Sequence, residues 1–192
     1  MKKLSFLFVI TITSLVSSAQ SKNYIPELPV KDGAIFYEEI VSLGTTAKKE
    51  VLYFRARKWF ANYYKKATQV LQMDDKDQGK LIGKGGYSYS FISGLLAYHI
   101  DLKYTLNLTV KDGKYRYQIY DFHSTDTVNS VFASSGDKPY VYDQDLSTEY
   151  LNDGKSSSKK YLSKLFTQFA LEINTTISSL KAAMIGKANS DF

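Results

Sequence analysis

The clearest pattern in the chain is an alternation of apolar and polar side chains over residues 99–110. Successive side chains of a strand point to opposite faces, so this period of two predicts a half-buried strand. The dipeptide Asp112-Gly113 follows and is typical of the tight hairpin turn in which both central residues have positive φ. We therefore predict a β-hairpin in which Lys103 pairs with Phe122.

The predicted register divides the second strand of this hairpin, residues 114–122, between two faces. Its odd-numbered aromatic residues join the apolar face, whereas Tyr120 and Phe122 fall on the polar face. Exposed rings bordered by hydrogen-bonding side chains are typical of a recognition surface. Two alternatives stay open: residues 123–157 could fold back over the rings, or the rings could follow strand propensity alone. The predicted binding patch comprises Lys103, Asn107, Arg116, Gln118, Tyr120 and Phe122.

Two segments place apolar residues at helical spacing. Residues 45–66 carry a wide apolar stripe, which suits a helix lying on a sheet, and Thr45 or Thr46 can cap its first turn. A second stripe follows the serines at 156–158, and Gly186 is well placed to end that helix. The second stripe is formed by Leu162, Phe166, Phe169, Ile173, Ile177, Leu180 and Met184.

Three further strands complete the predicted fold. β-Branched and aromatic residues predict strands at 34–41 and 70–73, and a polar turn at 75–79 leads into a longer strand at 80–91. Residues 123–157 are rich in Ser, Thr, Asp, Asn and Gly, so we expect an irregular segment there. The order β-α-β-β-β-β-α predicts the α+β class, with an antiparallel five-stranded sheet and two long helices on one face. Because these helices are apolar on one side only, the other face of the sheet should stay open.

The N-terminus has the pattern of a secretory signal peptide. Lys2 and Lys3 precede an apolar run at 4–16, and small residues at 17–19 form a cleavage site. The run is shorter than the ~20 apolar residues of a membrane-spanning helix, and no cysteine follows the cleavage site, so neither a transmembrane anchor nor a lipoprotein is expected. We expect a protein exported to the bacterial periplasm or secreted. Its predicted parts are a signal peptide at 1–19, a flexible lead-in at 20–33, one domain at 34–186 and a tail at 187–192.

Composition excludes several kinds of chemistry. The 192-residue chain has no cysteine and only two histidines, His99 and His123, so disulfides, iron–sulfur clusters and thiolate zinc sites are ruled out, and no cofactor or metal is expected. The formal net charge is +6, and two of the lysines lie in the predicted signal peptide. Basic side chains crowd the first predicted helix, but this modest excess and the predicted export argue against nucleic acid as a partner.

Three motifs suggest chemistry, and each departs from the spacing that the chemistry needs. The acidic run at 74–77 starts like a calcium loop but has glycine where the bidentate glutamate belongs. The glycines at 83–86 lack the spacing of a phosphate-binding loop and the helix that follows one. His99, Asp101 and Ser124 could form a hydrolytic set on the polar face of the hairpin, but the serine would face the carboxylate instead of the imidazole.

Four runs of the sequence resemble a known family. They lie at 36–41, 52–60, 77–85 and 104–116, and they consist mainly of core and turn residues. Together they are similar to a family of exported bacterial domains of unknown function, common in Bacteroidota, with a TBP-like fold. The resemblance spans about residues 34–122. It implies the fold and an exported location, and it transfers no activity and no catalytic residue.

The function that these observations favour is an exported, non-catalytic binding module of the bacterial envelope. Its open sheet face would contact a protein, a glycan or a small apolar ligand. Two alternatives stay open at this point. One is a hydrolase that uses His99, Asp101 and Ser124, and the other is a structural protein that self-associates through the open face.

Overall fold

The computed structural model describes residues 23–64, 71–152 and 158–186. The predicted signal peptide at 1–19 and the predicted tail at 187–192 lie outside the described residues. In the described ranges, no helix is both long enough and apolar enough to cross a membrane. The part of the predicted lead-in that is described is anchored to the domain, because Leu28 is buried and its backbone N–H donates to the hydroxyl of Tyr150 at 2.9 Å.

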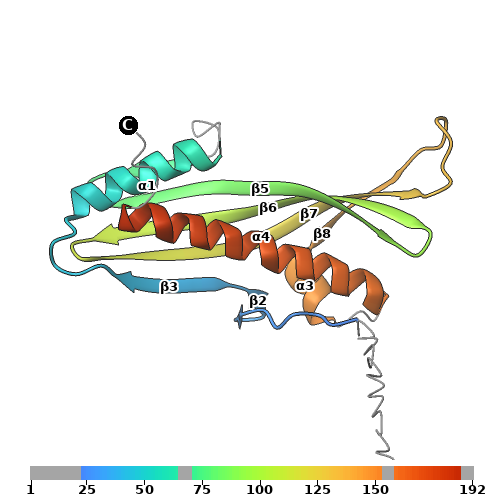
Figure 1. The fold of residues 1–192 in the computed structure, drawn as a ribbon, viewed down its shortest axis with the longest axis horizontal. Coiled ribbons are helices and arrows are strands. Elements are labelled where there is room, and N and C mark those ends of the chain that lie inside the picture. Colours follow the sequence, from blue (N-terminus) through green and yellow to red (C-terminus); the bar gives the residue numbers. More distant parts are fainter. Residues whose placement is uncertain (1–22, 65–70, 153–157, 187–192) are drawn as a thin grey trace, which may run out of the picture.

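The fold is of the α+β class and is built on a six-stranded antiparallel sheet, one strand more than the sequence predicts (Figure 1). The strand order is β3-β7-β6-β5-β4, and β8 pairs with the half of β7 that extends beyond β3. A separate two-stranded hairpin, β1–β2, precedes the sheet. The strands are β1 (Val30–Lys31), β2 (Ala34–Ile35), β3 (Tyr37–Ser42), β4 (Leu71–Asp75), β5 (Lys80–Ser93), β6 (Leu96–Lys111), β7 (Lys114–Ser130) and β8 (Tyr140–Asp145).

The helices lie on one side of this sheet. The long α4 (Lys159–Ile185) runs along the sheet, and α1 (Lys49–Tyr63) lies beside its C-terminal half, as Figure 1 shows. Trp59 of α1 donates to Ser179 of α4 at 3.0 Å. The short α3 (Leu146–Leu151) packs against the N-terminal half of α4. The apolar core fills the space between these helices and the sheet, as the predicted one-sided cover requires.

The alternation predicted for residues 99–110 is confirmed in β6. Every second side chain from Ile100 to Val110 is buried against the helices. The predicted ends of the last helix are also confirmed. Ser158 accepts a hydrogen bond from the backbone N–H of Tyr161 at 3.2 Å, and Gly186 ends the helix with a φ of 84°, a conformation that costs glycine little.

Helix α1 begins later than predicted, and neither Thr45 nor Thr46 caps it. Lys48, the residue before its first turn, makes no capping hydrogen bond with its side chain. The cap comes from the β6–β7 turn, where Asp112 Oδ1 accepts a hydrogen bond from the backbone N–H of Lys49 at 2.8 Å. The first turn of α1 is therefore capped by a residue 63 positions further along the chain, and not by a local threonine as predicted.

The same tertiary contact explains why the β6–β7 turn differs from the predicted type. Only Gly113 has positive φ, at 75°, and Asp112 does not. The turn is held against the segment before α1, because Gly113 donates to Ala47 O at 2.8 Å and accepts from Leu43 N at 2.7 Å. The backbone conformation follows from this docking and not from the dipeptide alone.

We expect Asp112→Ala to lower the free energy of unfolding by about 1 kcal/mol, since the variant leaves the first turn of α1 without its cap. Urea unfolding followed by circular dichroism measures this change. Asp112→Asn keeps an acceptor oxygen at the same place and is the matched control. Equal losses in the two variants would contradict a capping role.

The register of the β6–β7 hairpin follows the prediction only part of the way. Thr105 pairs with Tyr120 as predicted, but Lys103 pairs with His123. The extra residue is Asp121, whose φ of 61° lies in the left-handed region. A β-bulge of this kind puts two residues of one strand opposite one residue of its partner.

The bulge directs Phe122 into the core, so its predicted exposure is wrong. The Phe122 side chain is 0% exposed, and its ring centroid lies 5.0 Å from that of Phe169 in α4. Because a one-residue shift exchanges the two faces of a strand, the residues of β7 after Asp121 lie on the faces opposite to those predicted. Tyr120 precedes the bulge and keeps its predicted face.

The segment 123–157, predicted to be irregular, is largely regular where it is described. β7 continues to Ser130, β8 pairs with it, and α3 follows directly. Its polar residues fit into strands because they hydrogen-bond to one another, and Thr125 Oγ1, for example, donates to Asp143 Oδ1 at 2.6 Å. In its described part, residues 123–152, the segment widens the sheet and does not fold over the open face.

Candidate functional site

The candidate site is the face of the sheet that lies opposite α1, α3 and α4, which we call the open face. Alternate residues of β3 to β8 form it, and most of them are exposed or half-buried. Lys103 and Arg116 are exposed there, and Asn107, Gln118 and Tyr120 are half-buried. The structure therefore places five of the six predicted patch residues on one surface, and only Phe122 leaves it.

A row of hydrogen bonds crosses the open face from β3 to β6. Asn107 Nδ2 donates to Gln118 Oε1 at 2.9 Å, and Gln118 Nε2 donates to Glu38 Oε1 at 2.7 Å. Arg116 forms an ion pair with the same carboxylate at 3.7 Å. Side chains that hold one another in this way present amides in fixed directions, which lowers the entropy lost when a ligand binds.

Tyr120 does not stand alone on this surface. Its ring stacks on that of Phe36 with centroids 5.8 Å apart, and the ammonium group of Lys31 lies 5.0 Å from the Phe36 centroid. Phe36 lies between β2 and β3, and the sequence analysis treated it only as part of a strand. The contact could not be found from the hairpin register, because it depends on how β3 pairs with β7.

Charged residues gather at the centre of the open face, around the bulge. Asp121 forms an ion pair with Lys84, accepts a hydrogen bond from Thr105 at 3.0 Å, and lies 2.9 Å from His123 Nε2. The hydrogen bond from Lys84 is the largest of several effects that hold the pKa of the Asp121 carboxyl below its usual value. The left-handed backbone at Asp121 is thus fixed by contacts to two neighbouring strands, β5 and β6, and to His123 of its own strand.

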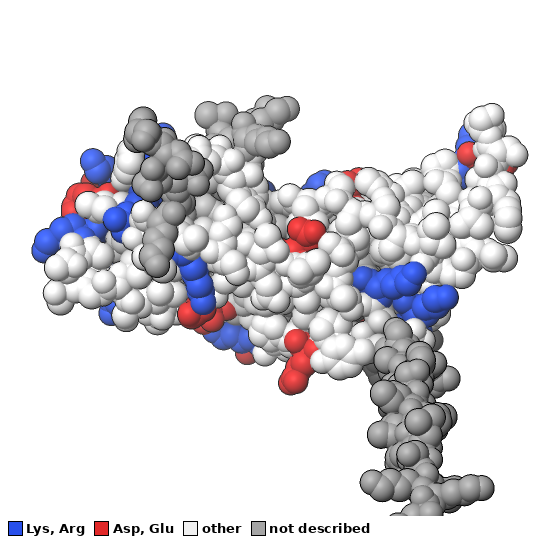
Figure 2. All heavy atoms as spheres, viewed as in Figure 1, with Lys and Arg blue, Asp and Glu red and all other residues white. Residues whose placement is uncertain are grey.

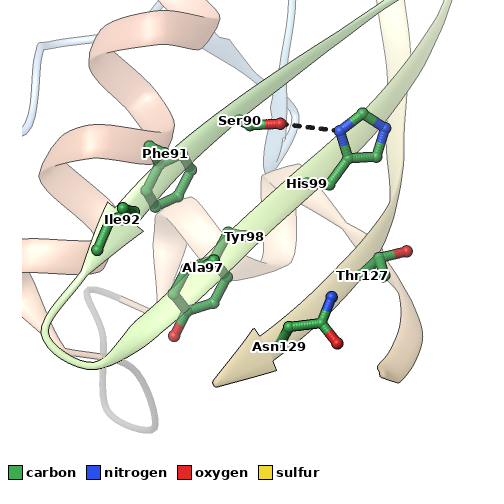
Figure 3. Close-up of a pocket in the computed structure, with 8 residues that line it drawn as sticks. All are labelled: Ser90, Phe91, Ile92, Ala97, Tyr98, His99, Thr127 and Asn129. Atoms are coloured by element: carbon green, nitrogen blue, oxygen red, sulfur yellow. Dashed lines mark hydrogen bonds between the residues drawn. The ribbon is translucent and has the colours of Figure 1, made fainter. Parts of the chain in front are cut away.

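The proposed hydrolytic set is not brought together. Ser124 lies after the bulge, on the helix side, and donates to the buried Asp126 at 2.6 Å, whereas His99 and Asp101 lie on the open face. A different serine meets the imidazole, because Ser90 Oγ lies 2.9 Å from His99 Nδ1 (Figure 3). His99 Nε2 lies 3.4 Å from Asp101 Oδ1.

The set formed by Ser90, His99 and Asp101 lacks features on which serine hydrolases depend. Ser90 lies within the extended strand β5 and not on a sharp turn. The side chains of His99 and Asp101 are about half exposed, at 50% and 47%. Figure 3 shows Ser90 and His99 among the residues that line a hollow near the ends of β5, β6 and β7. An exposed imidazole of this kind is not in the water-excluded site in which donors stabilise an oxyanion.

The helix side of the sheet holds a buried carboxyl group that sequence analysis did not single out. Asp126 is fully buried, and it accepts hydrogen bonds from Ser124 at 2.6 Å, from Gln144 at 2.9 Å and from Tyr161 at 2.9 Å. Burial raises the pKa of this carboxyl, and the hydrogen bonds act in the opposite direction. These contacts tie β7, β8 and α4 together, which is a structural role.

Metal chemistry finds no support in the described ranges, since no group of three or more His, Cys, Asp or Glu side chains there could hold an ion. The acidic run at 74–77 is used for local contacts instead. Asp74 pairs with Arg57 at 2.7 Å, and Asp75 Oδ1 accepts from the backbone N–H of Gln78 at 2.8 Å. The first contact joins β4 to α1, and the second closes the turn before β5.

The architecture is that of a TBP-like fold, in which helices cover one face of an antiparallel sheet. Residues 37–125 match the family model described as a domain of unknown function (DUF4468) with TBP-like fold. This part of the chain is similar to that family, in agreement with the resemblance noted in the sequence. No curated protein matches the chain.

Several solved structures are similar to this one. A DUF4468 family protein from Bacteroides ovatus has a TM-score of 0.60 and 15% sequence identity, over 86% of this chain and 94% of that one. A TBP-like protein from Parabacteroides distasonis has a TM-score of 0.57 and 16% identity, over 81% of this chain and 96% of that one. At these identities the likeness extends to the fold alone.

Proposed function

We propose that this chain is an exported, non-catalytic binding module that holds an extended glycan against the open face of its sheet. The observation that carries the proposal is the contrast between the two faces. One face is buried under three helices, while the other presents its side chains to solvent along strands of up to 17 residues. Export follows from the N-terminal pattern of the sequence.

The chemistry of the open face favours a glycan over the other ligands considered. Its hydroxyl and amide groups can donate and accept hydrogen bonds, and Tyr120 supplies a ring against which a sugar can pack. The large apolar side chains that are exposed on this face lie at its edges and not at its centre, for example Ile40, Ile92 and Val141. The cores of protein interfaces and pockets for apolar ligands are rich in such side chains. Basic residues such as Lys84 and Arg116 are paired with acidic ones, which disfavours a polyanion.

The test uses native gels that contain soluble polysaccharides, in which a bound protein migrates more slowly. We expect the double variant Gln118→Ala with Tyr120→Ala to bind about tenfold more weakly than wild type, the effect of losing about 1.4 kcal/mol at contacts of this kind. The control is Asn174→Ala, which removes an exposed amide from α4 on the opposite side. Retardation that is absent in wild type, or unchanged in the double variant, would refute the proposal.

One observation favours a hydrolase as the second candidate, namely the hydrogen bond between Ser90 and His99. A fluorophosphonate probe labels activated serines and therefore distinguishes the two functions. We expect no labelling of wild type, because His99 is open to water. Labelling that disappears in Ser90→Ala would replace the binding module with an enzyme. A dimer that forms with rising concentration and is lost in the open-face double variant would instead favour self-association.

A further inference from the structure

Exposed apolar side chains are concentrated at the end of the sheet that lies farthest from α1. They come from the β5–β6 turn and the strand ends that flank it, from the segment after β7 and from the start of β8. Phe132 is 77% exposed and Leu95 is 65% exposed. We call this group the apolar tip, and it comprises Ile92, Leu95, Leu96, Val131, Phe132 and Tyr140.

The members of the apolar tip lie together at one end of the sheet, on both of its faces: Ile92 lies on the open face, whereas Leu96 and Tyr140 lie on the helix side. The backbone N–H of Val131 donates to Leu95 O at 2.9 Å, which joins the segment after β7 to the β5–β6 turn. Leu96 and Tyr140 line the same hollow. Figure 1 shows that both connections project beyond the first turn of α4. The tip is therefore a protruding end and not a groove.

Lysines of the first turns of α4 lie next to the apolar tip, on the side toward the rest of the domain. Lys164 of α4 donates a hydrogen bond to the backbone carbonyl of Ile92. Lys160 lies one helical turn earlier on the same face, and Lys159 begins the helix. In Figure 2, Lys and Arg atoms gather over this first part of α4, beside an end of the sheet on which most atoms are uncharged. The segment after β7 adds Lys138 next to Asp137, so the surroundings of the tip are basic on balance.

We propose that the apolar tip inserts into the surface of a bilayer that contains anionic phospholipids. A bilayer has phosphate groups at its surface and an apolar interior. The projecting apolar side chains of the tip would enter the interior, and the lysines set back from them would contact the phosphates. Aromatic side chains such as Phe132 and Tyr140 suit the boundary between the layers. A protruding end fits a soft surface better than it fits a preformed protein groove. Docking there leaves the centre of the open face, around Gln118 and Tyr120, accessible.

Co-sedimentation with vesicles tests this proposal. Vesicles of phosphatidylglycerol with phosphatidylethanolamine are compared with vesicles of phosphatidylcholine alone, at low and high salt. We expect wild type to sediment with the anionic vesicles and to be released by salt, since exposed charges are screened. The full chain and the chain from Gln20 onward are both assayed, so that binding through the apolar N-terminal run is recognised as their difference.

The double variant Leu95→Asp with Phe132→Asp should bind anionic vesicles at least about tenfold more weakly. Phe54→Asp is the matched control, because Phe54 is 66% exposed but lies on α1 at the other end. No binding by wild type from Gln20 onward, equal binding to neutral vesicles, or equal loss in Phe54→Asp would each overturn the proposal. So would a concentration-dependent dimer that the tip variant abolishes without any vesicle binding, because the tip would then contact protein. Glycan retardation in gels should be unaffected by the tip variant, which separates this proposal from the first.

Discussion

Replacing Phe122 by Ala should lower the free energy of unfolding by about 3–5 kcal/mol, whereas replacing Tyr120 by Ala should lower it by about 1 kcal/mol or less. The two rings are separated by one residue, but the bulge at Asp121 places them on opposite faces. Phe122 loses contacts with rings of the core, and the cavity left by its removal is enclosed by the sheet and α4. Tyr120 loses only its stacking on Phe36 and a half-buried surface.

Urea unfolding of both variants measures this contrast. A loss in Tyr120→Ala as large as that in Phe122→Ala would mean that both rings are buried, and that the open face is covered. Similar small losses in both would mean that the hairpin keeps its unbulged register, in which the two rings lie together on the polar face. Either result would contradict the division of the sheet into a buried face and an open one.

Asp126→Ala should lower the free energy of unfolding by about 2–4 kcal/mol, because it removes the acceptor of the buried Ser124 and Tyr161 hydroxyls and of the half-buried Gln144 amide. The loss also loosens the attachment of β8 and α4 to β7. Asp143→Ala is the matched control on the neighbouring strand, since Asp143 is exposed and accepts from Thr125 only across the surface. Comparable losses in the two variants would contradict a special role for the buried carboxyl.

The pH dependence of Asp126→Asn tests the state of this carboxyl. Burial raises the pKa of Asp126 above that of the same group in the unfolded chain. A group of this kind supports folding fully below its unfolded pKa, which is about 3.9 for aspartate, and its support is lost as the pH rises through the higher folded value. The stability of wild type relative to Asp126→Asn should therefore fall as the pH rises through that window.

Unfolding curves of the two proteins at a series of pH values measure this difference directly. Asp121, whose pKa is lowered, contributes in the opposite direction, but it is common to both proteins and cancels. A difference that stays constant, or that grows with pH, would show that Asp126 is not destabilised as a carboxylate.

The elements of the fold could be predicted where a periodic pattern extends over several turns or residue pairs. The alternation in β6 and the stripe of α4 each depend on the burial of many residues, so no single contact changes them. The bulge at Asp121 could not be predicted, because it depends on contacts with Lys84 and Thr105 from other strands. The alternation of apolar and polar residues in the hairpin does not indicate those contacts.

Contacts between elements distant in sequence also explain the errors in the predicted site. A one-residue shift removed Phe122 and Ser124 from the predicted surface, and it left Gln118 and Tyr120 where they were expected. Strand β8 was missed although Tyr140, Val141 and Tyr142 have high strand propensity, because this short run lies among polar residues typical of a loop. Similarly, the cap of α1 comes from a turn distant in sequence, which no local motif can indicate.

The most direct test of the central claim is a titration of the ¹⁵N-labelled protein with the polysaccharide that retards it most in gels. We predict that the side-chain amide signals of Asn107 and Gln118 and the backbone signal of Tyr120 shift together, while those of Asn174 on α4 stay in place. Shifts confined to the helix side, or spread evenly over both faces, would contradict the assignment of the open face as the binding surface.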